Sequence, residues 1–548
     1  MNQELFEYVT NQRNTHHQLW VWGVLLLVMI LVSVIRIRLL DVPLERDEGE
    51  YAYGGQMLLQ GFLPYEPPSL YKYKLPGIYF LYAAALALFG KTQAGVHAGL
   101  LVANLTTMLL LFLLAKKLLG SFGAVSTAAF YAVISLSTSV LGLFAHAEHF
   151  VMLSTVGGLL LLLKSIDNYR WWKLFLSGVL LGCAYVIRQH GAAFIAFGGT
   201  YLIWQILWQS ERRWRHLISR PTIFCAGAVL PFLITCGIFL FAGTFDKFWF
   251  WTFVYARKNL EFVPFAEGLQ LLRMYIYKII TSSPLIWMLA LWGSVALLAN
   301  RRLKSQRFFT TVFFVFSFLS VCPGLYFRRH YFVTLLPAIA LLAGLGAAQL
   351  KDFALGRLRP SSAALISFAV ILISVAWTVC YEYEVFFSLP PRDVSRATYG
   401  GNPFPESLEI ARYIEKHSSS NDTIAILGSE PQILFYANRR SSTGYTDTYE
   451  MMKSHPYAIQ MQNEMIREIE AASPRFIVFV QIYSSWLTEP DSYMRIFDWF
   501  EKYQEKHYTK VGVVDIADFT TTFYYWGKEA GDYKPVSENW IAVFERKN

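Results

Sequence analysis

The stretch LWVWGVLLLVMILVSVIRIRLL, residues 19–40, decides the class of fold. An α-helix needs about 20 apolar residues to cross the hydrocarbon core of a bilayer, and this run is long enough. It is too long for a removable signal peptide and lacks a small-residue cleavage site. We therefore interpret it as the first membrane-spanning helix.

The whole composition agrees with a protein that crosses the membrane many times. Of 548 residues, 55% are hydrophobic and only 16% are charged, which is too apolar for an ordinary soluble enzyme. The net charge of +9 comes from short basic clusters between apolar runs, so we assign it to topology and expect no nucleic acid. The five cysteines lie in or beside apolar runs without a CxxC pair, which predicts buried thiols.

Apolar runs long enough to span a bilayer predict about 11 transmembrane helices. They cover residues 19–40, 94–115, 121–142, 147–163, 172–188, 191–208, 222–243, 283–299, 308–325, 331–350 and 361–381. A shorter run over residues 75–89 opens with Pro76-Gly77. We expect it to form a juxtamembrane or re-entrant helix.

The basic residues indicate the topology, because lysine and arginine concentrate in cytoplasmic loops. From Lys116 onward they cluster at alternate loops. The alternation predicts a cytoplasmic amino terminus, an external first loop over residues 41–93 and an external carboxy terminus. Arg36 and Arg38 oppose this assignment, since they lie at the expected outer end of the first span.

A second domain follows the transmembrane part. The composition becomes mixed and polar after Tyr381, and Pro390-Pro391 marks a linker, so we predict domains over residues 1–389 and 390–548. In the latter we expect helices over 405–417, 457–472 and 492–504 and strands over 423–427, 475–482, 511–516 and 540–544. This alternation predicts a small extracytoplasmic α/β sandwich.

The expected external loops share an unusual set of polar residues. The first holds Glu45, Asp47, Glu48 and Glu50, and then Lys72 and Lys74. Later turns add His146, Glu148, His149, Arg188, His190, Arg328, Arg329, His330 and Tyr331. Charges near the bilayer often mark a functional site. Snorkelling and an aromatic belt are the alternative explanation for the basic and aromatic residues, but neither explains the acidic cluster.

Carboxylates facing lysines and arginines suit the attack of a hydroxyl or amine on a carbon that carries a phosphate leaving group. The carboxylate would act as general base, and the cations would stabilise the departing charge. Because the outside of a membrane has no nucleotide pool, an activated donor there would be carried by a lipid. The residues therefore point to sugar transfer from a polyprenyl phosphate.

Several motifs occur in order over about residues 40–350. They are Asp47-Glu48 followed by Tyr51-Ala52, Lys74-Leu75-Pro76, Glu148 in HAEHF, YVIRQHG from Tyr185, and RRHYFVTLLPAIALLAG from Arg328. This set resembles the GT-C class of integral-membrane glycosyltransferases (glycosyltransferase family 39/83-like), specifically the bacterial relatives of protein O-mannosyltransferases and of the lipid A aminoarabinose transferase. The family has Lys-Pro-Pro where this chain has Lys-Leu-Pro.

The resemblance implies an inverting hexosyl- or pentosyltransferase that takes its sugar from undecaprenyl or decaprenyl phosphate. It would act at the periplasmic face of a bacterial inner membrane on an envelope glycan, lipid or protein. Asp47 would be the base or an acceptor-orienting group, with Glu48 beside it, and Glu45 and Glu50 would be solvated neighbours. The donor phosphate would be held by Lys72, Lys74, Arg188, Arg328, Arg329, His330 and Tyr331. Further polar contacts would come from Glu148, His146, His149 and His190.

Some alternatives stay open. We expect no cofactor, although a divalent metal near the acidic pair is an alternative. A lipid-linked sugar flippase or transporter and an oligosaccharide ligase are the rival functions. The acceptor is not decided. The aromatic stretch over residues 249–282 would cover the site, bind the acceptor or form an interfacial aromatic belt.

Overall fold

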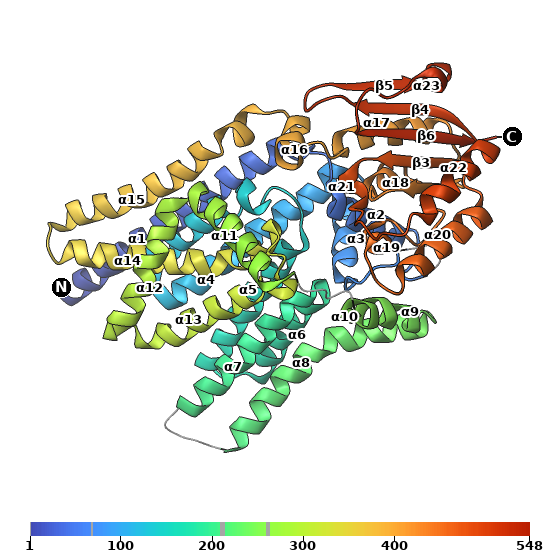
Figure 1. The fold of residues 1–548 in the computed structure, drawn as a ribbon. Coiled ribbons are helices and arrows are strands. Elements are labelled where there is room, and N and C mark those ends of the chain that lie inside the picture. The colour runs from blue at the N-terminus through green and yellow to red at the C-terminus, as the bar shows by residue number, and fades with distance from the viewer. Residues whose placement is uncertain (1, 67–69, 209–213, 259–262, 548) are drawn as a thin grey trace. The chain divides into compact units, whose positions relative to one another are not determined.

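The computed structural model describes residues 2–66, 70–208, 214–258 and 263–547 (Figure 1). The chain forms two compact units. The first comprises Met1–Leu39, Leu100–Gly237 and Glu261–Ser388, and the second comprises Leu40–Gly99, Ile238–Leu260 and Leu389–Asn548. The second unit therefore joins the loop after the first long helix to the carboxy-terminal region.

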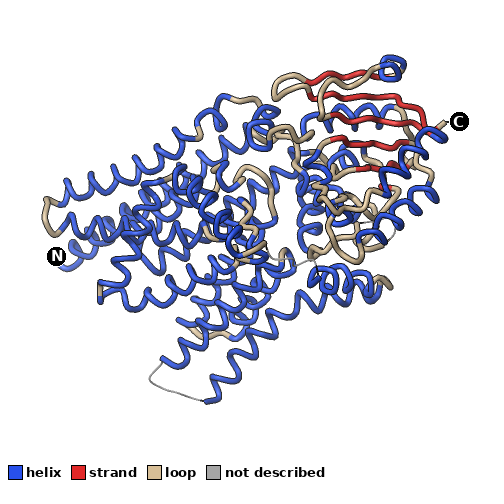
Figure 2. The backbone as a smooth tube through the Cα atoms, in the orientation of Figure 1, coloured by secondary structure: helices blue, strands red, loops and turns tan. Residues whose placement is uncertain are grey.

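The described residues of the first unit form helices and connecting segments (Figure 2). The α-helices are α1 (Asn2–Arg38), most of α4 (Gln93–Ile134), α5 (Ala147–Asp167), α6 (Trp171–Ile187), α7 (Ala192–Trp208), most of α8 (Trp214–Phe241), α11 (Phe265–Ser282), α12 (Pro284–Ala299), α13 (Lys304–Leu319), α14 (Leu336–Leu355) and α15 (Pro360–Tyr381). Short 3-10 or π-helical turns are η1 (Thr138–Val140), η2 (Gln189–Gly191), η4 (Arg301–Leu303), η5 (Pro323–Leu325), η6 (Arg329–Thr334) and η7 (Glu384–Ser388).

Each run predicted to span the membrane overlaps a helix. By length and composition, 7 helices among the described residues could cross a membrane, or up to 8 if the bent pair α11 and α12 forms one span. Helix α6 and the helix α3 (Gly77–Phe89), which occupies the predicted 75–89 run, are apolar but shorter. The protein is a multi-pass membrane protein, and the count of about 11 crossings stays a prediction.

Two predicted spans, 94–115 and 121–142, lie in the single element α4. It breaks at Gly120, whose φ of 75° belongs to the region that glycine adopts without a steric cost. The predicted end at residue 142 is wrong, because α4 ends at Ile134. Residues 135–146 are a largely irregular connection that contains only the short turn η1.

The two arginines at the end of α1 bind backbone carbonyl groups of the first unit. Arg36 is buried and donates to the Gly142 carbonyl at 3.0 Å. Arg38 donates to the carbonyls of Val385 and Phe386 at 3.3 and 3.2 Å. Buried carbonyl groups outside regular helices need such donors. This requirement accounts for arginines that the topology argument left unexplained.

The second unit contains a sheet and several short helices. Its helices are α2 (Arg46–Leu59), α3, α9 (Phe245–Trp249), the π-helix η3 (Phe250–Tyr255), α10 (Ala256–Lys258), α16 (Pro391–Tyr399), α17 (Phe404–Lys416), α18 (Gln432–Ala437), α19 (Tyr449–Met452), α20 (Ala458–Ala472), α21 (Tyr483–Trp486), α22 (Arg495–His507) and α23 (Lys528–Asp532). Its strands are β1 (Thr423–Leu427), β2 (Arg440–Ser441), β3 (Phe476–Gln481), β4 (Tyr508–Ile516), β5 (Thr522–Trp526) and β6 (Trp540–Arg546).

The strands form one mixed sheet in the order β2-β1-β3-β6-β4-β5. Strands β2, β1 and β3 are parallel, and the pairs β3–β6, β6–β4 and β4–β5 are antiparallel. Phe476 contacts Tyr413 of α17, whereas Phe479 stacks on Phe500 of α22. Residues at an odd spacing along a strand point to opposite faces, so the two helices cover the two faces. The predicted α/β sandwich is confirmed, with β2 and β5 added.

Helix α2 packs closely on α18 within the second unit. A Cβ atom at Gly49 would lie 2.6 Å from Cβ and 2.7 Å from the backbone nitrogen of Gln432. Arg46 pairs with Glu430 at 2.5 Å, and Tyr436 Oη accepts from the Leu44 amide at 2.8 Å. The start of α2 is therefore attached to the carboxy-terminal part of the unit.

Replacing Gly49 with alanine tests this close approach. Because the added methyl group meets backbone atoms, we expect Gly49→Ala to lower the free energy of unfolding by about 1–3 kcal/mol. Thermal unfolding in detergent measures the effect. Gly531→Ala is the matched control, since Gly531 is also helical and a Cβ there meets nothing within 4 Å. Equal melting temperatures for the two variants would contradict the packing.

Candidate active site

The second unit brings the acidic residues of α2 together with the lysines that precede α3. Glu45 caps α2, since its side chain accepts from the Glu48 amide at 2.9 Å and the Glu48 side chain accepts from the Glu45 amide at 3.1 Å. This capping box defines where the helix begins. Asp47 and Glu50 are then three residues apart on a helix, a spacing that places side chains on one face.

Lys74 binds both of these carboxylates. Its Nζ lies 2.8 Å from Asp47 Oδ1 and 3.1 Å from Glu50 Oε2. Lys72 Nζ lies 3.2 Å from the same Glu50 oxygen and also pairs with Asp447. The two predicted lysines are thus part of one buried network with Asp47.

The network favours the charged forms of Glu50 and Lys74. Burial tends to raise the pKa of Glu50, but Lys72 and Lys74 outweigh it and hold that pKa below its usual value. Burial tends to lower the pKa of Lys74, but Asp47 and Glu50 outweigh it and raise that pKa well above its usual value. Tyr79 Oη adds a hydrogen bond to Glu50 at 2.7 Å. Lys74 is therefore a fixed cation beside Asp47.

The adjacent acids Asp47 and Glu48 have different surroundings. Glu48 has no exposed side-chain surface and shares a hydrogen bond with His97 Nε2 at 3.1 Å. His97 Nδ1 also donates to the Leu40 carbonyl at 2.8 Å. The Asp47 side chain keeps 23% of its surface exposed. Of the two, Asp47 is the carboxylate that an incoming molecule reaches more easily.

Glu45 and Glu50 are not solvated, so that expectation is wrong. They are only 5% and 2% exposed. Burial, followed by the nearby carboxylates of Asp47 and Glu48, raises the pKa of Glu45 well above its usual value. Sequence reasoning also missed His97 and Asp447. The three-residue spacing of Asp47 and Glu50 places side chains on one face of a helix and was a usable signal for Glu50, whereas the other two partners are distant in sequence.

The first unit gathers a separate group of predicted residues. Glu148 at the start of α5 is fully buried and lies 3.0 Å from Arg188 Nη1. The Arg188 guanidinium also lies over the Tyr331 ring, 5.0 Å from its centroid. His190 contacts the same ring edge-on at 4.7 Å. The YVIRQHG and RRHYF motifs therefore meet around Tyr331.

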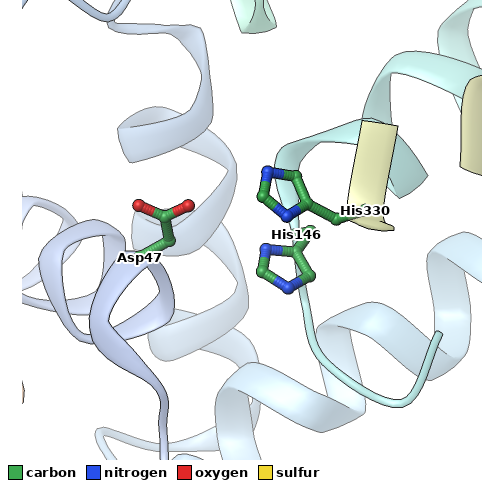
Figure 3. A group of neighbouring side chains, drawn as sticks. All are labelled: Asp47, His146 and His330. Carbon is green, nitrogen blue, oxygen red and sulfur yellow. The ribbon is translucent and has the colours of Figure 1, made fainter. Parts of the chain in front are cut away.

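Two histidines of the first unit stack on each other. The rings of His146 and His330 are 4.3 Å apart at an interplanar angle of 13° (Figure 3). Both are buried. Asp47, also drawn there, belongs to the second unit. His149 is buried on α5, and neither of its ring nitrogens has a hydrogen-bond partner among the described residues.

The neighbouring arginines Arg328 and Arg329 differ in their contacts. Arg329 donates to the carbonyls of Thr138 and Ser139, the latter at 3.3 Å, and so binds the connection between α4 and α5. Arg328 is exposed and lies over the Tyr326 ring at 5.6 Å. Each unit thus assembles its own share of the predicted site. The roles assigned to these residues stay predictions.

The Glu148–Arg188 pair predicts strong coupling in stability. Removing one partner of a buried ion pair leaves an uncompensated charge and costs about 3–5 kcal/mol. We expect Glu148→Gln and Arg188→Met each to lower the melting temperature sharply. The decrease in melting temperature of the double variant should be smaller than the sum of the decreases of the two single variants. Additive losses in a double-mutant cycle would contradict the pairing.

Comparison with known proteins agrees with this architecture. The family described as dolichyl-phosphate-mannose-protein mannosyltransferase (PMT_2) matches residues 73–240. ArnT from Cupriavidus metallidurans, solved with undecaprenyl phosphate, has 14% sequence identity and a TM-score of 0.58, over 95% of this chain and 98% of that chain. The oligosaccharyltransferase AglB from Archaeoglobus fulgidus was solved with an inhibitory peptide and a dolichol-phosphate. It has 12% sequence identity and a TM-score of 0.55, over 93% of this chain and 75% of that chain.

Comparison with curated protein sequences finds no match. The structural likenesses and the family match confirm the resemblance that the motifs indicated: the chain has the fold of the GT-C class of membrane glycosyltransferases. At these identities the likeness to solved structures concerns the fold.

Proposed function

We propose that this protein is a membrane glycosyltransferase that moves a sugar from a polyprenyl-phosphate donor to a hydroxyl or amine of an acceptor. The observation that carries the proposal is the geometry at Asp47, a partly exposed carboxylate bound to the buried cation Lys74. Support comes from the similar proteins, because ArnT was solved with undecaprenyl phosphate and AglB with a dolichol-phosphate.

In the proposed reaction Asp47 accepts the proton of the acceptor hydroxyl or amine. The acceptor atom forms a bond to the anomeric carbon, and the bond from that carbon to the phosphate oxygen breaks. The lipid phosphate leaves with the electron pair and gains negative charge. Lys74, which its carboxylate partners keep protonated, stabilises that charge. A single displacement inverts the anomeric configuration.

The proposed setting is the periplasmic face of a bacterial inner membrane, with a cytoplasmic amino terminus. The alternating basic loops from Lys116 onward support this orientation. The sugar would be a hexose or pentose, and the acceptor a glycan, lipid or protein. Mass spectrometry of the lipids and glycans of cells with and without the protein would identify both.

The rival functions are an oligosaccharide ligase and a lipid-linked sugar flippase. The chain covers 98% of ArnT but 75% of AglB. A flippase would move a labelled lipid-sugar into vesicles without forming any transfer product.

Asp47→Asn tests the general base. Removing a general base costs about 10²–10⁴-fold in rate, so we expect transfer by the reconstituted protein to fall by that factor. Asp41→Asn is the matched control, since Asp41 is an exposed acid in the same loop. Turnover near that of the unmodified protein, with correct folding and insertion, would reject Asp47 as the base.

We also propose that transfer requires no divalent metal. The carboxylates of Asp47 and Glu50 are compensated by Lys72 and Lys74, whereas Mg²⁺ and Ca²⁺ are normally held by carboxylates and other oxygen ligands. Dialysis against EDTA should therefore leave the transfer rate unchanged. Loss of activity that added Zn²⁺ or Mn²⁺ restores would contradict this proposal.

A further inference from the structure

A cavity of about 290 Å³ lies in the second unit, bounded by Tyr71, by the segment of α9 and η3, and by α20. Its lining residues are distinct from Asp47 and Lys74, which carry the proposed reaction. The volume is near the lower end of the range for small-ligand sites, which are about 300–1,000 Å³. Such a space can accept one or two rings of a small molecule.

Aromatic side chains form the inner walls of the cavity. The rings of Tyr71 and Trp251 are nearly parallel, with an interplanar angle of 12° and centroids 5.9 Å apart. Tyr445 contacts both rings edge-on, at 5.4 and 6.0 Å. All three are buried. Together with Phe250 and Tyr457 they line the cavity, so part of its wall is aromatic carbon against which the C–H groups of a sugar ring can pack.

Hydrogen bonds hold two of these walls in place. Tyr445 Oη donates to Glu464 Oε2 at 2.8 Å, and Tyr71 Oη donates to Glu468 Oε1 at 3.2 Å. Lys247 donates to Tyr71 Oη at 3.1 Å and lies over its ring. The walls are therefore ordered before any ligand arrives, which lowers the entropy cost of binding.

The rim of the cavity is polar. Asp246, Lys247 and Gln460 are exposed there, and Glu464 is half-buried. Carboxylate and amide groups are suitable partners for ligand hydroxyl groups. Two carboxylates against one lysine disfavour a phosphate or uronic acid, and a charged rim disfavours an acyl chain. The chemistry thus favours a neutral saccharide.

We propose that this cavity is a subsite for a neutral sugar ring of the glycosyl substrate. The inference rests on the proposed transferase function and adds a substrate-binding element to it. Tyr71 immediately precedes Lys72, which binds Glu50, so the cavity wall and the charged network share one segment. Trp251 and Tyr255 are 6% and 1% exposed. Such burial is unlike an aromatic belt that faces lipid headgroups.

Binding of simple glycosides tests the subsite without turnover. Methyl glycosides of mannose, glucose and N-acetylglucosamine would be added to the full chain in lipid nanodiscs and followed by saturation-transfer NMR. We expect at least one glycoside to bind, and both Trp251→Leu and Glu464→Gln to weaken that binding by about tenfold. Trp499→Leu on α22 is the matched control, since Trp499 lies outside this cavity.

Absence of binding by every glycoside, or equal binding by Trp251→Leu and Trp499→Leu, would overturn the subsite. Glu464→Gln preserves shape at a half-buried position, so it keeps the test valid if Trp251→Leu fails to fold. In a transfer assay of Trp251→Leu and Glu464→Gln, an increase in the KM for the acceptor identifies the bound ring as an acceptor sugar. An increase in the KM for the donor identifies it as the donor sugar. If Asp47→Asn loses turnover but the unmodified protein binds none of the glycosides, the proposed transferase function stands and only the subsite is rejected.

Discussion

The ion pairs of Lys74 with Asp47 and Glu50 are the interaction on which the second unit depends. Taking carboxylates out of water is costly unless a cation and further hydrogen bonds compensate them. Lys74, Lys72 and Tyr79 supply that compensation for Glu50. The segment that carries the lysines is consequently held against α2, and Asp47 is held at the edge of the network.

This arrangement also explains why α2 belongs to the same compact unit as the carboxy-terminal sheet. Arg46 pairs with Glu430, Lys72 pairs with Asp447, and Gly49 allows α2 to approach Gln432. The short helix α2, which carries the proposed general base Asp47, is thereby held on a rigid support. Precise positioning of a general base needs such support, because small displacements reduce catalysis strongly.

Much of the fold was predictable because its signals are local. Apolar runs locate the helices of the first unit, and the alternation after Tyr381 locates most strands of the sheet. The break at Gly120 falls in the gap between the two spans predicted there, whereas the end of α4 at Ile134 was missed because the apolar run continues past it. Strand β2, of two residues, gives no usable periodicity and depends on pairing with β1.

The sequence by itself determined the membrane class, the positions of most helices and the choice of Asp47 and Lys74 as candidates, because hydrophobicity and motif order are properties of the chain. Only the tertiary structure decided which carboxylates are buried and which partners they have. Glu50 was expected in solvent but lies between two lysines, and Glu48 meets His97. Burial and charge pairing depend on residues far apart in sequence, and only the packed chain brings them within a few ångströms.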